Sequence, residues 1–209
     1  MVQVHALMKG RDFRPTEDAD FLVDLMSDHL GVTHLAHVLG RYGYEILPGT
    51  LSGYTTRMQK STGEKVDLLV ADHLPQWVER KRLARLGTGR MFSAPAGAQA
   101  CERSMELELR DGDRAASIRI PDQLGALILK AAARMADKGP DRDRHLIDAA
   151  ILCAIMDDPD KEHERLHSAN DFRRLRALRD DIVDNQDYLQ YLSMDDLAAA
   201  RQAIEILAA

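Results

Sequence analysis

The sequence is poor in cysteine and has no long apolar run. Its 209 residues contain two cysteines, Cys101 and Cys153, far apart and outside any C-x-x-C spacing. This pattern argues against a disulfide framework and fits a reducing compartment. The longest apolar runs, such as "LGALIL" and "AAILCAIM", are shorter than the roughly 20 residues of a membrane span, and no signal-peptide pattern is present. We therefore expect a cytoplasmic protein that has no membrane partner.

An excess of positive charge is also absent. The formal net charge is -6, which argues against a general polyanion binder, so contact with nucleic acid would need a local basic patch. Two clusters qualify: "RKRLAR" together with Arg90, and "RRLRALR" from Arg173 to Arg179. Acidic residues lie near both, so a solvated charged face is the default interpretation. The first cluster becomes a candidate for substrate docking if it flanks a metal site.

The chain does contain enough apolar residues for a sizeable core. Hydrophobic residues make up 45% of it, and its length fits one domain plus an appendage, or two small domains. Strand-like and short helical segments fill the first part, whereas the segments after Pro121 are helical. We expect an α+β protein with one domain at residues 1–120 and a helical domain at residues 121–209.

Apolar periodicity predicts the individual elements. "EKVDLLVAD" alternates as a buried strand, with Asp67 on the face opposite Val66, Leu68 and Val70. Further strands are expected in "YEILP" and "YTTRMQ", a helix near residues 28–41, and a hairpin in "MELELRDGDRAASIRI". Four helices are expected in the back half: one from Pro121 to before Gly139, and others in "DRHLIDAAILCAIM", near "FRRLRALRDDI" and in "SMDDLAAARQAIEIL", where Ser193 and Asp196 have capping-box spacing.

The acidic segment "RPTEDADFLVD" fits two structures. As a strand it would place Asp18 and Asp20 on one face and apolar side chains on the other. Two carboxylates that close repel each other, so the arrangement is favourable mainly when a hard cation such as Mg²⁺ shares their oxygens. As a helix, the segment would be capped by Thr16 or Asp18, and the acids would complement the helix dipole. Periodicity alone does not choose between the two.

The order of several motifs resembles a known family. "RPTEDAD", then "KVDLLVAD", then "IPDQLGALILKAAARMADKGPDRDRHLIDAAILC" are similar to the AbiEii/MenT group of nucleotidyltransferases, within the polymerase-β-like superfamily. None of the motifs is specific alone; their order and spacing carry the resemblance. It implies a nucleotidyltransferase-like mixed β-sheet with flanking helices, followed by a C-terminal helical bundle.

The resemblance also implies a metal site. Asp18 and Asp20 match the first two metal-binding carboxylates of the family, and Asp67 matches the third. Together they would hold Mg²⁺ or Mn²⁺ around the phosphates of a nucleoside triphosphate, and Asp67 would also position or deprotonate the acceptor hydroxyl.

Residues of the helical half would complete the site. Lys130 matches a family lysine that assists at the triphosphate, and Asp143, with Asp148 more loosely, matches a K-D-x-x-D-like segment. Lys130, Arg134 and Lys138 recur at four-residue steps, where like charges cost a few tenths of a kcal/mol per pair. An anionic ligand would offset this cost, so Arg134 is a second candidate for nucleotide binding. Side chains snorkelling at the border of a buried helix are the alternative for Arg134 and Lys138.

The resemblance implies that the protein transfers a nucleoside monophosphate to RNA, such as a tRNA end, in a Mg²⁺-dependent reaction. It also implies a toxin-antitoxin or phage-defence setting. A cognate antitoxin would be the partner. The chain departs from the family because no Gly-Gly or Gly-Ser turn precedes the acidic motif, and "MVQVHALMKG" corresponds to the helix after that turn. We expect Met1 to be an internal or misassigned start. The alternative is a catalytically degenerate nucleotidyltransferase-fold protein that acts as a binding or regulatory module.

A separate motif, "HERLH", matches the H-E-x-x-H pattern of zinc proteases. His163 and His167 would lie one helical turn apart, with Glu164 as the base. The segment is highly charged and no downstream histidine supplies a third ligand, so we expect an exposed surface segment instead.

Overall fold

The computed structural model describes residues 1–11, 16, 18–49, 53–140, 142–184 and 192–209. The chain forms two compact units, each described by itself: a sheet unit of residues 15–101, and a helical unit of residues 1–14 and 102–209. It is a mixed α/β protein with a mixed sheet and several helices, in agreement with the expected class. Among the described residues, no helix combines the length and the apolar character needed to cross a membrane.

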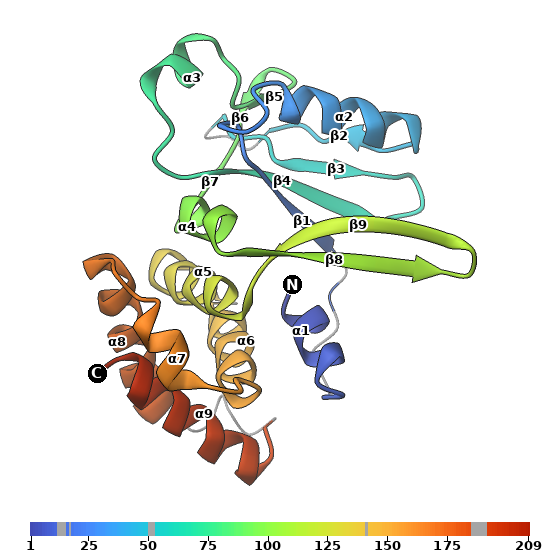
Figure 1. Cartoon of the computed structure of the whole chain (residues 1–209). Helices are drawn as coiled ribbons and strands as arrows, with labels where there is room; N and C mark the ends of the chain where they lie inside the picture. The colour runs from blue at the N-terminus through green and yellow to red at the C-terminus, as the bar shows by residue number, and fades with distance from the viewer. Residues whose placement is uncertain (12–15, 17, 50–52, 141, 185–191) are drawn as a thin grey trace. The chain divides into compact units, whose positions relative to one another are not determined.

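A mixed sheet is the frame of the sheet unit (Figure 1). Its central strand, β4 (Lys65–Ala71), pairs in parallel with β1 (Asp18–Val23) and antiparallel with β3 (Arg57–Gln59). The short β7 (Ser93–Ala94) pairs in parallel with the end of β4, and β2 (Glu45–Ile46) extends the sheet beyond β3. The strand expected in "EKVDLLVAD" is confirmed, with the even-numbered apolar side chains buried as predicted.

The acidic segment is a strand from Asp18 onward, not a helix. The side-chain hydroxyl of Thr16 donates to the Asp18 carboxylate at 2.7 Å, so Thr16 caps no helix here. The face expected to be apolar packs only at its end, because Val23 is buried whereas Phe21 is 42% exposed. Arg14, Pro15 and Glu17 of the motif lie outside the described residues.

One face of this sheet carries the core of the unit. Helix α2 (Gly31–Arg41) packs Leu35, Ala36 and Leu39 against the buried side chains of β4 and β3. A short helix, α3 (Gln76–Arg80), and a small ribbon of β5 (Arg85–Leu86) and β6 (Gly89–Arg90) add to the same core. Val66, Leu68 and Val70 therefore point into the core, which leaves Asp67 on the opposite face. That face is covered at the end of β4 by α4 (Gly97–Glu102), where an added Cβ on Gly97 would lie 2.9 Å from the Ala71 Cα.

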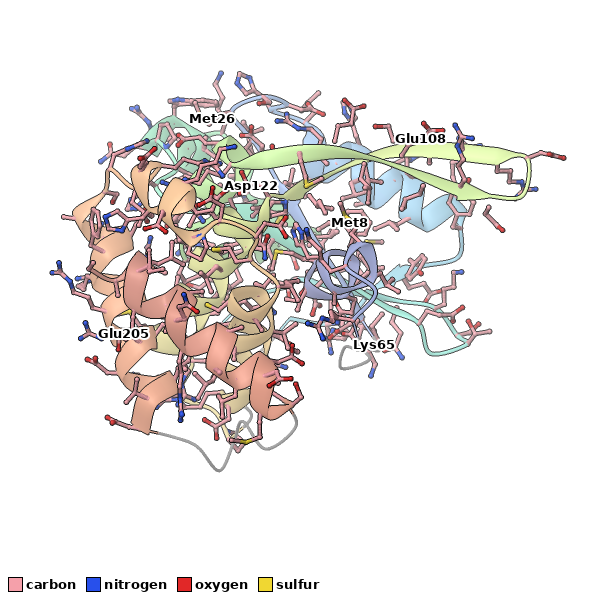
Figure 2. All side chains as sticks on the ribbon, turned by 60° about the horizontal axis from the view of Figure 1, so that its bottom comes forward. Met8, Met26, Lys65, Glu108, Asp122 and Glu205 are labelled. Atoms are coloured by element: carbon pink, nitrogen blue, oxygen red, sulfur yellow. The ribbon has the colours of Figure 1, made fainter. Side chains whose placement is uncertain are left out.

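The helical unit confirms the four helices expected after residue 120. These are α5 (Gln123–Ala136), α6 (Asp143–Ala154), α8 (Ala169–Asp184) and α9 (Met194–Leu207), joined by the shorter α1 (Val2–Met8) and α7 (Pro159–Glu164). Ser193 caps α9 as predicted, because its hydroxyl accepts the Asp196 N–H at 3.1 Å. The start of α5 differs, since Asp122 is its N-cap and Pro121 ends the preceding strand. Exposed charged side chains such as Glu205 cover the outer surface of the helices (Figure 2).

The expected hairpin, β8 (Ser104–Asp111) with β9 (Arg114–Pro121), belongs to the helical unit, whereas the sequence analysis assigned it to the domain of residues 1–120. The two strands form a separate two-stranded sheet. At the base of the hairpin, Asp122, the N-cap of α5, donates its N–H to Arg103 O at 2.8 Å, and the ring of His5 in α1 bonds to Pro121 O at 2.9 Å. The boundary between the sheet unit and the helical unit therefore lies near residue 101.

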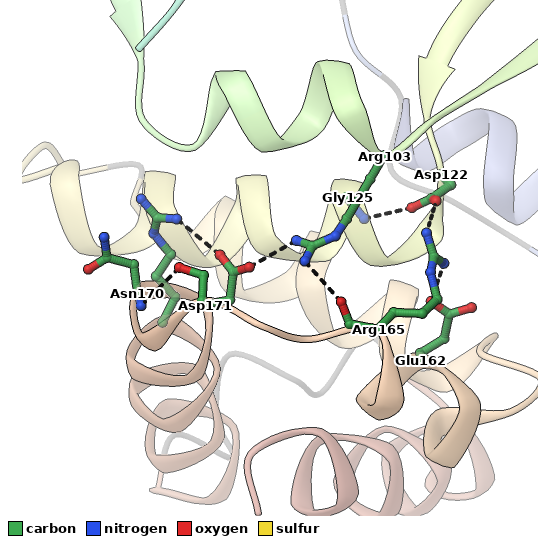
Figure 3. Close-up of polar contacts among 9 residues, drawn as sticks. Arg103, Asp122, Gly125, Glu162, Arg165, Asn170 and Asp171 are labelled. Carbon is green, nitrogen blue, oxygen red and sulfur yellow. Dashed lines mark hydrogen bonds and ion pairs between the residues drawn. The ribbon is translucent and has the colours of Figure 1, made fainter. Parts of the chain in front are cut away.

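A polar network joins the base of the hairpin to three helices (Figure 3). Arg103 donates to the Asp171 carboxylate of α8 at 2.9 Å and to the Arg165 carbonyl, just after α7, at 3.2 Å. Arg165 in turn pairs with Asp122, the N-cap of α5. The Asp171 side chain is only 3% exposed, so its negative charge is held by Arg103 and Arg174 rather than by water.

Alanine in place of Asp171 tests the contribution of this network. The substitution leaves the guanidinium groups of Arg103 and Arg174 without their buried partner, which typically costs about 3–5 kcal/mol. We expect the free energy of unfolding, measured in urea, to fall by about this amount. Asp180→Ala is the control in the same helix, because the Asp180 side chain is 62% exposed and pairs with Arg179 at the surface. Equal losses in the two variants would contradict a structural role for the network.

Candidate functional site

The register of β1 against β4 gathers the expected carboxylates on one face of the sheet. Asp20 lies opposite Asp67, and Asp18 lies opposite Lys65. Residues opposite each other in a parallel pair point to the same side, as do residues two apart in one strand. Asp18, Asp20 and Asp67 therefore share the face away from the core, although they come from segments far apart in the sequence.

Arg57 of β3 lies beside these carboxylates, on the next strand of the sheet. It lies opposite Asp67 on the other edge of β4. Its Nε donates to Asp67 Oδ1 at 2.8 Å, its Nη2 donates to Asp67 Oδ2, and the same Nη2 reaches Asp18 Oδ2 at 3.3 Å. Arg57 is thus the bridge between carboxylates of two strands.

The bridge is electrostatically favourable. The hydrogen bond to Asp67 raises the pKa of the Arg57 guanidinium above its usual value, and the charges of Asp67, Asp18 and Asp20 act in the same direction. The Asp67 side chain is 16% exposed, against 38% for Arg57 and 36% for Asp18, so Asp67 depends most on a fixed positive charge. Arg57 supplies the positive charge that a metal ion was expected to bring to these carboxylates.

Sequence reasoning did not identify Arg57. The only available signal was a cation within the predicted strand "YTTRMQ", and the register that places it against Asp67 is not a local property. Within the described residues, no group of three His, Cys, Asp or Glu side chains is arranged to hold a metal ion. The carboxylates are hard oxygen ligands of the type that Mg²⁺ prefers, but two of them already share the guanidinium.

The basic residues expected at the triphosphate form a second cluster, within the helical unit. Lys130 of α5 donates to Asp148 of α6 at 2.7 Å, and the Asp148 side chain is 4% exposed. Arg134, one turn later, pairs with Asp143 of α6 and donates to Asp181 of α8 at 2.8 Å. Carboxylates of the same unit therefore compensate Lys130 and Arg134, the role expected of an anionic ligand, whereas Lys138 donates to the Met135 carbonyl.

His145 borders this second cluster. Its Nε2 lies 3.2 Å from Asp137 Oδ2. Burial lowers the pKa of His145 below its usual 6.5, and the positive charges of Lys130 and Arg144 lower it further, against the opposing effect of Asp137. The neutral imidazole is thus the form that the folded protein favours.

The zinc-protease motif does not form a ligand pair. Helix α7 ends at Glu164, and His167 lies beyond it as an exposed residue. His163 instead packs its ring against Phe172, with the ring centroids 5.7 Å apart. The expectation of a surface segment is confirmed for Glu164 and His167.

Comparison with protein-family models, with curated proteins and with solved structures found no match for this chain. The candidate site consequently rests on geometry and chemistry. Of the expected residues, Asp18, Asp20 and Asp67 lie together in the sheet unit. Lys130 and Arg134 lie on one helix of the helical unit, each paired with a carboxylate of α6.

A double-mutant cycle tests the charge balance on the carboxylate face. We expect Arg57→Met to lower the free energy of unfolding by about 1–2 kcal/mol, because it removes hydrogen bonds to a charged group that is partly screened by solvent. Adding Asp67→Asn should restore part of the loss, since it removes one of the repelling charges. Urea unfolding at low salt measures both, with Arg41→Met as an exposed-arginine control. Strictly additive losses would contradict the bridge.

A pH titration of stability tests the environment of His145. Because its pKa is lower in the folded state than in the unfolded state, the unfolded state binds more protons below the usual value of 6.5. We expect the free energy of unfolding to fall as the pH drops from about 7.5 to about 5.5. His145→Gln should reduce this dependence without abolishing it, because burial also lowers the pKa of His5 in the same unit; His167→Gln, an exposed histidine, is the control. An unchanged slope in His145→Gln would contradict the assignment.

Proposed function

We propose that this protein is a Mg²⁺-dependent nucleotidyltransferase that transfers a nucleoside monophosphate from a nucleoside triphosphate to an acceptor, RNA such as tRNA. The observation that supports the proposal is the parallel register of β1 and β4, which aligns Asp20 with Asp67 and keeps Asp18 on the same face. A D-x-D strand beside a strand with a third carboxylate is the arrangement that a nucleotidyltransferase-like sheet requires. The similarity of motif order to the AbiEii/MenT group adds to this support.

Each carboxylate has a proposed role. Asp18 and Asp20 would hold Mg²⁺ or Mn²⁺, whose charge neutralises the phosphate oxygens. Asp67, the least exposed of the bridged carboxylates, would accept the proton of the attacking hydroxyl as a general base. Arg57 would keep the face electrically balanced before the substrate arrives, and its guanidinium would then be available to bind phosphate oxygens.

The helical unit has a proposed supporting role. As the resemblance implies, Lys130 and Arg134 would contact phosphate oxygens, with Asp143 helping to orient Arg134 through their ion pair. Lys130 would have to exchange its bond with Asp148 for one with a phosphate. In this proposal the protein acts in the cytoplasm, in a toxin-antitoxin or phage-defence setting, with a cognate antitoxin as partner.

Cys153 has no part in the proposed chemistry. Burial raises the pKa of its thiol to about 12, which keeps the thiol protonated and unreactive.

A specific observation favours a second candidate, a degenerate nucleotidyltransferase-fold module that binds without catalysis. Arg57 bridges Asp67 and Asp18 and so supplies internally the charge that a metal would bring. A protein that never binds the metal would be stabilised by such a bridge.

Labelled nucleotide incorporation separates the two candidates. The purified chain is incubated with each labelled nucleoside triphosphate, Mg²⁺ and total RNA, and the RNA is resolved on a denaturing gel. The enzyme proposal predicts incorporation that falls at least about a hundredfold in Asp67→Asn, as expected for loss of a general base. Asp113→Asn, at the exposed turn of the hairpin, is the matched control and should retain activity.

The Arg57→Met variant further separates the enzyme from the binding module. If Arg57 only competes with the metal, this variant should need less Mg²⁺ for half-maximal incorporation, and Mg²⁺ should raise its melting temperature more than NaCl of equal ionic strength does. Absence of incorporation with both the wild-type chain and Arg57→Met would sink the enzyme proposal and favour the binding module.

A further inference from the structure

Positive charge is concentrated in one short part of a chain that is acidic overall. The segment 79–90 contains five cations and a single carboxylate, Glu79, although the whole chain has a net charge of -6. The segment includes the end of α3 and all of the β5–β6 ribbon, which lie next to one another in the sheet unit (Figure 1). We call its cations, with two neighbouring aromatic residues, the basic-aromatic patch: Arg80, Lys81, Arg82, Arg85, Arg90, Tyr54 and Phe92.

The cations of this patch are poorly compensated. Arg85 lies directly opposite Arg90 in the antiparallel ribbon, and like charges in that position destabilise a sheet. Glu79 approaches Arg90 at 3.4 Å, while Arg85 donates to the Thr88 carbonyl at 3.1 Å. Within the described residues, Arg80, Arg82 and Arg85 form no ion pair. Arg80 and Arg82 are exposed, so both are accessible to an anionic ligand.

Two exposed aromatic rings lie beside Arg90. Tyr54 forms a β-bridge with Arg90, and its ring meets the Phe92 ring edge to face at a centroid distance of 6.1 Å. Phe92 is 48% exposed and Tyr54 38% exposed. Two exposed rings in mutual contact beside Arg90, which faces Arg85 across the ribbon, fit a ligand that has both flat apolar faces and negative charge.

We propose that the basic-aromatic patch binds single-stranded nucleic acid. The cations would contact successive phosphates, and the rings of Phe92 and Tyr54 would stack on bases, a combination that tolerates any sequence. An acidic protein segment would pair with the cations but would gain little from the rings. Binding at the patch requires no catalysis, whereas its use to dock an RNA acceptor rests on the proposed function.

Fluorescence anisotropy tests the proposal on the full chain, without nucleotide or Mg²⁺. The probes are end-labelled single-stranded RNA and DNA of one length and mixed sequence, a duplex of that sequence, and labelled polyglutamate. We expect the single strands to bind more tightly than the duplex and polyglutamate. Arg80→Gln with Arg82→Gln should reduce the slope of log Kd against log salt concentration by about 1.4, since each phosphate contact on a single strand contributes roughly 0.7. Phe92→Ala should weaken binding at least about fivefold through lost stacking.

Arg110→Gln with Arg114→Gln is the matched control, because it removes the same charge from the exposed hairpin. It should leave the salt slope unchanged. The proposal is overturned if the single strands fail to bind at low salt, if polyglutamate binds equally well, or if the control variant loses as much affinity as the patch variant. Binding without nucleotide incorporation would leave the patch established and count against the nucleotidyltransferase alone.

Discussion

The structure of the sheet unit depends on how three carboxylates on one face of a sheet are kept from repelling one another. The β1–β4 register places Asp18, Asp20 and Asp67 on the same side, where like charges repel one another unless a positive charge compensates them. Arg57 supplies it by bridging Asp67 and Asp18. The proposed enzyme would replace part of this internal compensation with a metal ion, and the proposed binding module would retain it.

The helical unit also depends on charge compensation, and some of its charged side chains are more deeply buried than those of the sheet unit. Asp171, Asp148 and Arg134 are almost completely buried, and each pairs with an opposite charge on another element. Removing a charge from water is costly, so a buried ion persists only when partners are fixed around it. The network of Figure 3 therefore holds the hairpin base and the helices in one arrangement, and the pairs of Lys130 and Arg134 do so for α5, α6 and α8.

Uncompensated charge, in contrast, is found at the surface. The basic-aromatic patch keeps Arg80 and Arg82 exposed and sets Arg85 against Arg90, an arrangement that folding alone does not favour. Binding of an anionic ligand would compensate these exposed cations. Arg80 and Arg82 could therefore contact a ligand without giving up an ion pair with a described residue, whereas Lys130 and Arg134 could not.

The sequence by itself determined most of the local structure, because its signals act over a few residues. The alternation around Asp67 predicted β4 and the orientation of that side chain, and the Ser193 cap marked the start of α9. Tertiary structure decided the rest. Pairing with β4 made the acidic segment a strand, register brought Arg57 to Asp67, and helix packing gave Lys130 and Arg134 their carboxylates. The reason is that charge compensation depends on distances between segments far apart in the chain, which neither periodicity nor spacing specifies.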